Sequence, residues 1–64
     1  MKNLAAIQTW ELQADLQASI TDIATCEMAL LQGITTYSGG SVQERLDANK
    51  RFVIVINDEL KRRE

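Results

Sequence analysis

The sequence predicts a mainly α-helical protein, folded as an antiparallel hairpin of two helices with a long first helix. Three observations lead to this fold class. Residues 3–32 contain neither glycine nor proline and are rich in the helix formers Ala, Leu, Gln and Glu. All three glycines then fall between residues 33 and 40. A second stretch without glycine or proline follows, and its apolar residues again recur at helical spacing.

The first helix is expected to span residues 3–32. Its apolar residues follow steps of four, four, three and seven, which places them on one stripe of a helix. This stripe consists of Leu12, Leu16, Ile20, Ile23 and Leu30. The opposite face carries Gln13, Asp15, Gln17, Asp22 and Thr25. Gly33 followed by Ile34 fits a left-handed glycine cap, so the helix is expected to end there.

A glycine-rich loop over residues 33–41, with or without a stunted β-hairpin, is expected to lead into a second helix over residues 42–62. Ser41 and Glu44 match a capping box, in which each side chain accepts a hydrogen bond from the other residue's backbone N–H. The inner seam of this helix alternates steps of four and three, as in a coiled coil. It consists of Val42, Leu46, Asn49, Val53, Ile56 and Leu60, and Phe52 is expected to thicken the same face.

Residues 52–56 (FVIVI) are continuous and largely β-branched, so a buried strand is the alternative to helix there. The capping sequence upstream and the charged, helix-forming sequence downstream favour helix. On a helix, Ile54 points away from the seam. An apolar residue at that position suggests burial by something other than the first helix. Glu59 and Arg63 are spaced as an i,i+4 ion pair.

The chain is short enough to be one domain, residues 1–64, with a thin core. Its single cysteine and lack of histidine exclude an intramolecular disulfide and a zinc ligand set. Extra stability is therefore expected from oligomerisation or a partner chain. The lone thiol, a start without a signal-peptide pattern and the absence of long apolar runs predict a protein that is neither secreted nor membrane-bound. We expect it in the cytoplasm.

No set of residues indicates chemistry. The carboxylates have plainer roles as caps and ion-pair partners, and no histidine could activate Cys26, which is expected to be a packing residue. Gly39 and Gly40 precede a helix, but no strand and lysine accompany them as a nucleotide site requires. We therefore expect no enzyme, no cofactor, no metal and no small-molecule substrate. A net charge of −2 and a pI near 5.0 argue against nucleic acid, which leaves protein as the partner.

The two predicted helices differ in length. A helix of about 30 residues is roughly 45 Å long, and one of about 21 residues roughly 32 Å. In an antiparallel hairpin, Leu4, Ile7 and Trp10 would then project beyond the second helix and form an anchor for a partner. The alternative is that the first helix breaks near Thr9 and the preceding turns fold back over the seam as ordinary core.

Three short segments in the second half of the chain resemble a known family. They are 29–33 (ALLQG), 36–42 (TYSGGSV) and 56–63 (INDELKRR), with Leu46 between them. Together they look like small tailed-phage proteins of the head-to-tail joining (W-type) group. The resemblance implies a virion protein that forms a ring, seals the portal and offers a surface to the tail. It also implies contacts with neighbouring subunits through Tyr37, Ser38, Gly39, Gly40, Lys61, Arg62 and Arg63.

The sequence therefore favours a non-catalytic structural or adaptor protein, a homo-oligomer or a ring with portal and tail proteins, as in a phage head-tail connector. Two alternatives stay open: a small helical-hairpin co-chaperone similar to those of type III secretion, and a phage-encoded inhibitor of a host enzyme. Stoichiometry separates the connector from the co-chaperone, because a ring contains many copies and a co-chaperone forms a small heterocomplex. The predicted interface residues are Leu4, Ile7, Trp10, Tyr37, Ile54, Lys61, Arg62 and Arg63.

Overall fold

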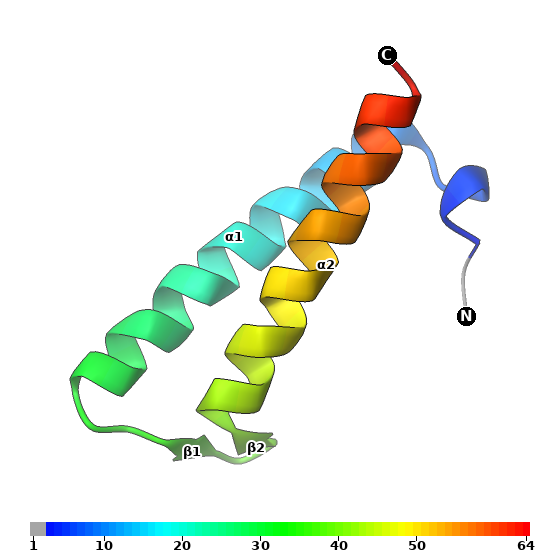
Figure 1. Cartoon of the computed structure of the whole chain (residues 1–64). Coiled ribbons are helices and arrows are strands. Elements are labelled where there is room, and N and C mark those ends of the chain that lie inside the picture. The colour runs from blue at the N-terminus through cyan, green and yellow to red at the C-terminus, as the bar shows by residue number, and fades with distance from the viewer. Residues whose placement is uncertain (1–2) are drawn as a thin grey trace.

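A computed structural model describes residues 3–64 and shows two antiparallel helices joined at one end by a short pair of strands (Figure 1). The elements in chain order are the 3₁₀ turn η1 (Leu4–Ala6), α1 (Thr9–Leu31), β1 (Thr36–Tyr37), β2 (Gly40–Ser41) and α2 (Val42–Arg62). The predicted fold class is confirmed: the protein is mainly helical, its first helix is long, and the loop contains a stunted β-hairpin.

The first helix begins later than predicted. The chain makes one 3₁₀ turn, passes through extended backbone at Ile7 and Gln8, and enters α1 at Thr9. The prediction of a continuous helix from residue 3 is therefore wrong, and the break near Thr9 is what the structure contains. With 23 residues in α1 and 21 in α2, the two helices are nearly equal in length and no helical overhang exists.

One local contact and two contacts that are remote in sequence hold the N-terminal turn and account for the break. The Asn3 side chain caps η1 by accepting a hydrogen bond from the Ala5 N–H at 3.1 Å. The Arg63 guanidinium, at the far end of the chain, donates to the Leu4 carbonyl at 2.8 Å and to the Thr9 hydroxyl at 3.0 Å. A continuous helix would carry the Leu4 carbonyl away from α2. The N-terminal turn instead lies beside the C-terminal end of α2 (Figure 1).

The six seam positions of α2 are confirmed, whereas Phe52, which was expected to thicken the same face, is 44% exposed because it lies on the outside of the helix. Val42, Leu46 and Ile56 are buried, and Asn49, Val53 and Leu60 are half-buried. Residues 52–56 are helical, which settles the choice between helix and strand. Their β-branched side chains are accommodated because only Val53 and Ile56 face α1, while the others lie on the outside of the helix.

The seam of α1 differs from the predicted stripe at three positions. Ser19 and Cys26 are buried, whereas Ile20 is 45% exposed. The helix therefore presents Leu12, Leu16, Ser19, Ile23, Cys26 and Leu30, with the same alternation of four and three as α2. Cys26 packs as a buried free thiol with Val42 and Leu46, and Ile23, Ala29 and Leu30 surround this cluster.

The glycine cap of α1 is confirmed. Gly33 has a φ of +82°, the Gly33 N–H bonds the Leu30 carbonyl at 3.0 Å, and the Ile34 N–H bonds the Ala29 carbonyl at 2.9 Å. This is the hydrogen-bond pattern of a Schellman motif. The loop then forms its two-residue strands, which pair Thr36 with Ser41.

Ser41 also begins α2, because its hydroxyl accepts a hydrogen bond from the Glu44 N–H at 3.3 Å. The predicted cap on this side chain is therefore present. Two local motifs thus define both helix ends that flank the loop.

Replacing Gly33 with alanine should lower the free energy of unfolding by roughly 1–2 kcal/mol, because a Cβ disfavours the left-handed conformation at φ +82°. No atom lies near the added Cβ, so the cost comes from the backbone alone. Urea unfolding followed by circular dichroism measures it. Gly33→Asn is the matched control and should cost less, since asparagine tolerates this conformation. Equal stability of wild type and Gly33→Ala would contradict the assignment of this cap.

Candidate protein-binding surface

Many large apolar side chains lie on the outside of this hairpin. Among the described residues, nine are exposed and only five apolar side chains are buried. The exposed set is Trp10, Ile20, Met28, Leu31, Ile34, Tyr37, Phe52, Ile54 and Val55. Scattered single apolar residues are ordinary on protein surfaces, so the arrangement of this set decides what it means.

The total accessible surface is also large for the mass. It is 4778 Å² for 7.2 kDa, about 650 Å² more than the roughly 4,100 Å² of a compact monomer of that size. The excess arises because two helices in a single layer bury one side of each and leave the rest open. An interface with another chain would remove such excess area.

One continuous apolar stripe runs along the outer side of α1. Ile20, Ala24, Met28 and Leu31 follow steps of four, four and three, which aligns them on one side of the helix. These four residues are called the Ile20 face below. All four are exposed, Leu31 by 83% and Met28 by 56%. Helical spacing places the stripe about a third of a turn from the buried seam.

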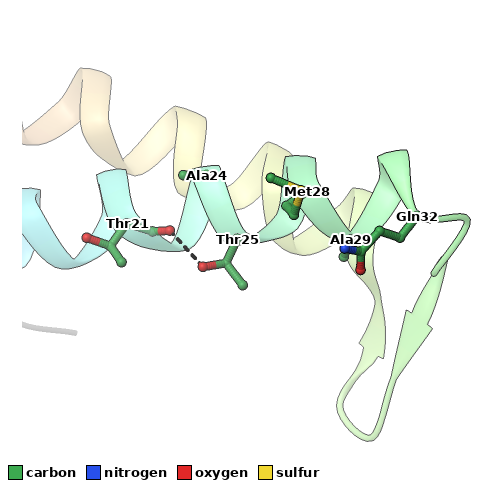
Figure 2. A pocket seen from close by; sticks show the side chains of 6 residues that line it. All are labelled: Thr21, Ala24, Thr25, Met28, Ala29 and Gln32. Carbon is green, nitrogen blue, oxygen red and sulfur yellow. Dashed lines mark hydrogen bonds between the residues drawn. The ribbon is translucent and has the colours of Figure 1, made fainter.

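A shallow hollow adjoins the Ile20 face (Figure 2). Its walls come from α1 and its C-cap residue Gln32, and none of them is charged: Thr21, Ala24, Thr25, Met28, Ala29 and Gln32. The Thr25 hydroxyl donates to the Thr21 carbonyl at 3.0 Å, and the Thr21 hydroxyl donates to the Gln17 carbonyl at the same distance. Both hydroxyl protons are thus used within the helix. The hollow therefore suits an apolar side chain better than a charged ligand.

A smaller apolar patch lies on α2. Phe52 and Val55 are each 44% exposed on the side of the helix that also carries the charged Arg45 and Glu59. Ile54 is 61% exposed and points away from the seam, as its spacing predicts. The exposed apolar residues of α2 therefore lie on two separate sides of the helix, Phe52 with Val55 on one and Ile54 on the other, whereas those of α1 form one continuous stripe.

The predicted N-terminal anchor survives only in part. Trp10 is 68% exposed, so its indole is available to a partner. Leu4 and Ile7 are half-buried, because η1 folds back beside α2 and does not extend beyond it. The prediction that all three project freely from an overhanging helix is wrong.

The three basic residues of the tail, Lys61, Arg62 and Arg63, also differ in exposure. Arg63 is half-buried and already bound within the chain, since its Nε donates to Glu59 at 3.0 Å in addition to its contacts with Leu4 and Thr9. The predicted i,i+4 pair of Glu59 and Arg63 is thus present. Lys61 and Arg62 are exposed, and the Arg62 guanidinium lies 3.9 Å from Glu59. Of the three predicted basic contacts, Lys61 and Arg62 face solvent and Arg63 holds the N-terminal turn.

Tyr37, the predicted loop contact, is partly exposed at the strand end of the hairpin. The Arg45 guanidinium lies over its ring, 5.1 Å from the ring centre, in a cation–π arrangement. The ring also lies so close to Gly39 that a Cβ there would come within 2.5 Å of it. A side chain at residue 39 would therefore require the Tyr37 ring to move from its position under Arg45.

A polar cluster joins the helices next to Tyr37. Arg45 binds both carboxylate oxygens of Asp22, with its Nε 2.7 Å from Oδ2. Asn49 donates to Asp22 at 2.7 Å and to the Arg45 carbonyl at 2.9 Å. The sequence predicts Asp22 on the face opposite the apolar stripe and Asn49 within the seam of the second helix. In the structure, the contacts of Asp22 on α1 with Arg45 and Asn49 on α2 fix the register between the two helices.

This cluster shifts two pKa values. The hydrogen bonds from Arg45 lower the pKa of the Asp22 carboxyl, assisted by Asn49 and by the positive charge of Arg45, and together they outweigh partial desolvation. The pKa of Arg45 is raised, mainly by its hydrogen bonds to Asp22. Both shifts favour the charged forms that hold the helices in register.

Within residues 3–64, no group of three or more His, Cys, Asp or Glu side chains could hold a metal ion. Over the same residues, neither helix combines the length and the apolar character needed to cross a membrane. Comparison with known proteins finds no matching family model, no similar curated protein and no similar solved structure. Function is therefore argued from the geometry of this surface.

Replacing Asp22 with asparagine should destabilise the fold at neutral pH and make stability less dependent on pH. The folded pKa of Asp22 lies below its unfolded value of about 3.9, so its contribution is full above that pH and disappears as the pH falls through the folded pKa. Urea unfolding at pH 7 and near pH 2.5 tests this. The wild-type advantage should shrink at the lower pH. Asp47→Asn, on the exposed side of α2, is the control. A gap between wild type and Asp22→Asn that is independent of pH would contradict the ion-pair account.

Proposed function

We propose that this chain is a non-catalytic structural or adaptor protein, which assembles with other protein chains through apolar side chains on the outside of its helical hairpin. One observation carries the proposal: nine large apolar side chains are exposed, whereas only five apolar side chains are buried and the rest of the seam is half-buried. Burying one such side chain contributes about 1.5–3 kcal/mol. A partner that covers several of them would supply stability that the thin core lacks.

The shape of the molecule supports assembly at more than one place. The principal extents are 40 × 21 × 15 Å, so the hairpin is a rod. Tyr37 and the strand pair occupy one end, and Lys61, Arg62 and Trp10 lie toward the other. A rod with different contact residues at its two ends can touch different neighbours along its length.

The finer proposal is a component of a tailed-phage head-to-tail connector. Two helices linked by a glycine-containing strand pair, with exposed basic residues at the end of the second helix, support it. In such a ring, Tyr37 and the adjacent glycines would contact one neighbour and Lys61 with Arg62 another. Arg63 is not among these contacts, because it is bound within the chain.

Native sedimentation of the protein from the cells or particles in which it is made tests the proposal. We expect the chain in a complex of defined stoichiometry, many times heavier than 7.2 kDa if it belongs to a connector ring. A complex containing one or two partner chains would replace the connector by the co-chaperone or inhibitor class. Recovery as a free 7.2 kDa chain, both in the extract and after purification, would contradict assembly as its function.

A further inference from the structure

We infer that the Ile20 face binds a second copy of this chain, with the two α1 helices antiparallel, so that two hairpins form a four-helix assembly. The inference rests on the proposed function and names the partner for this one face. Three observations support self-association: the spacing of the apolar residues, the charges that flank them, and the area available.

The spacing suits a twofold axis at Ala24. Ile20, Ala24 and Met28 form a ridge at intervals of four residues, the kind of ridge that packs against its equivalent on another helix. With the axis at Ala24, Ile20 of each copy faces Met28 of the other, and the two Ala24 residues meet. Alanine in the centre lets the two backbones approach closely. The same surface is thus complementary to itself, as a twofold interface requires.

The flanking charges complement each other between copies. Glu27 on α1 and Lys50 on α2 border the Ile20 face on the side toward the α1–α2 groove, and neither forms an ion pair within residues 3–64. The contacts of Asp22 with Arg45 and Asn49 place Lys50 level with the middle of α1. An antiparallel copy brings its Lys50 to about the height of Glu27. Two symmetry-related Glu27–Lys50 pairs then form at the edges of the interface.

The area also fits. A stable interface of standard size removes about 800 Å² from each partner. The excess of about 650 Å² over a compact monomer of this mass is of the same order. The patch around Phe52 is less suited to a second copy, because Arg45 and Glu59 on the same side of α2 already have partners within the chain.

The test compares matched variants of the purified full chain by sedimentation equilibrium, with circular dichroism to verify the helices. Wild type should be a dimer. Ala24→Glu brings two carboxylates together at the twofold axis and should weaken dimerisation about a hundredfold or more. Ala48→Glu places the same charge at an exposed alanine on the other helix, on the side away from Lys50, and should leave the dimer intact.

A charge exchange tests the orientation. Glu27→Lys and Lys50→Glu should each weaken the dimer, and the double variant should restore it. Failure of the double variant to recover the affinity lost by the single variants would overturn the antiparallel arrangement. A monomeric wild type would overturn self-association, as would a dimer that Ala48→Glu disrupts and Ala24→Glu does not. Both results leave the proposed function to be decided by the native complex.

Discussion

A hairpin of two helices has a single internal seam, and everything else in this structure depends on that constraint. Each helix can bury one stripe, so the core within residues 3–64 contains only five buried apolar side chains. Larger domains cover the remaining faces of a helix with further elements. Here the outer side of α1 stays apolar and open. We propose that this uncovered apolar surface, more than any single residue, is the reason the chain assembles with other chains.

Polar contacts near both ends of the seam hold the hairpin in one register. Near the loop, Asp22 binds Arg45 and Asn49, and at the open end Arg63 binds Glu59, Thr9 and the Leu4 carbonyl. Because the apolar seams of α1 and α2 repeat the same four-three spacing, apolar contacts alone would also allow one helix to pack shifted by a turn along the other. These directional contacts favour one alignment, and they fix the positions of the exposed side chains relative to each other.

The parts that sequence predicts correctly are those with local causes. Gly33, Ser41 and the four-three spacing of α2 act within a few residues, so the loop, both flanking helix ends and the second seam follow from them. The beginning of α1 does not, because its break depends on an Arg63 contact with a residue 59 positions away. Ser19 and Cys26 do not appear in the predicted stripe, because small or polar residues do not mark a seam by hydropathy, although the packing role expected for Cys26 is present. The four-three rule applied to α1 as to α2 would have found both.

Thermal unfolding at a series of chain concentrations tests the central claim most directly. If the outer apolar surface is covered by another chain, folding is coupled to association and the melting temperature rises with protein concentration. The account predicts a clear rise over a hundredfold range of concentration. A melting temperature that stays constant over that range would show that one hairpin is sufficient by itself, and would contradict the account.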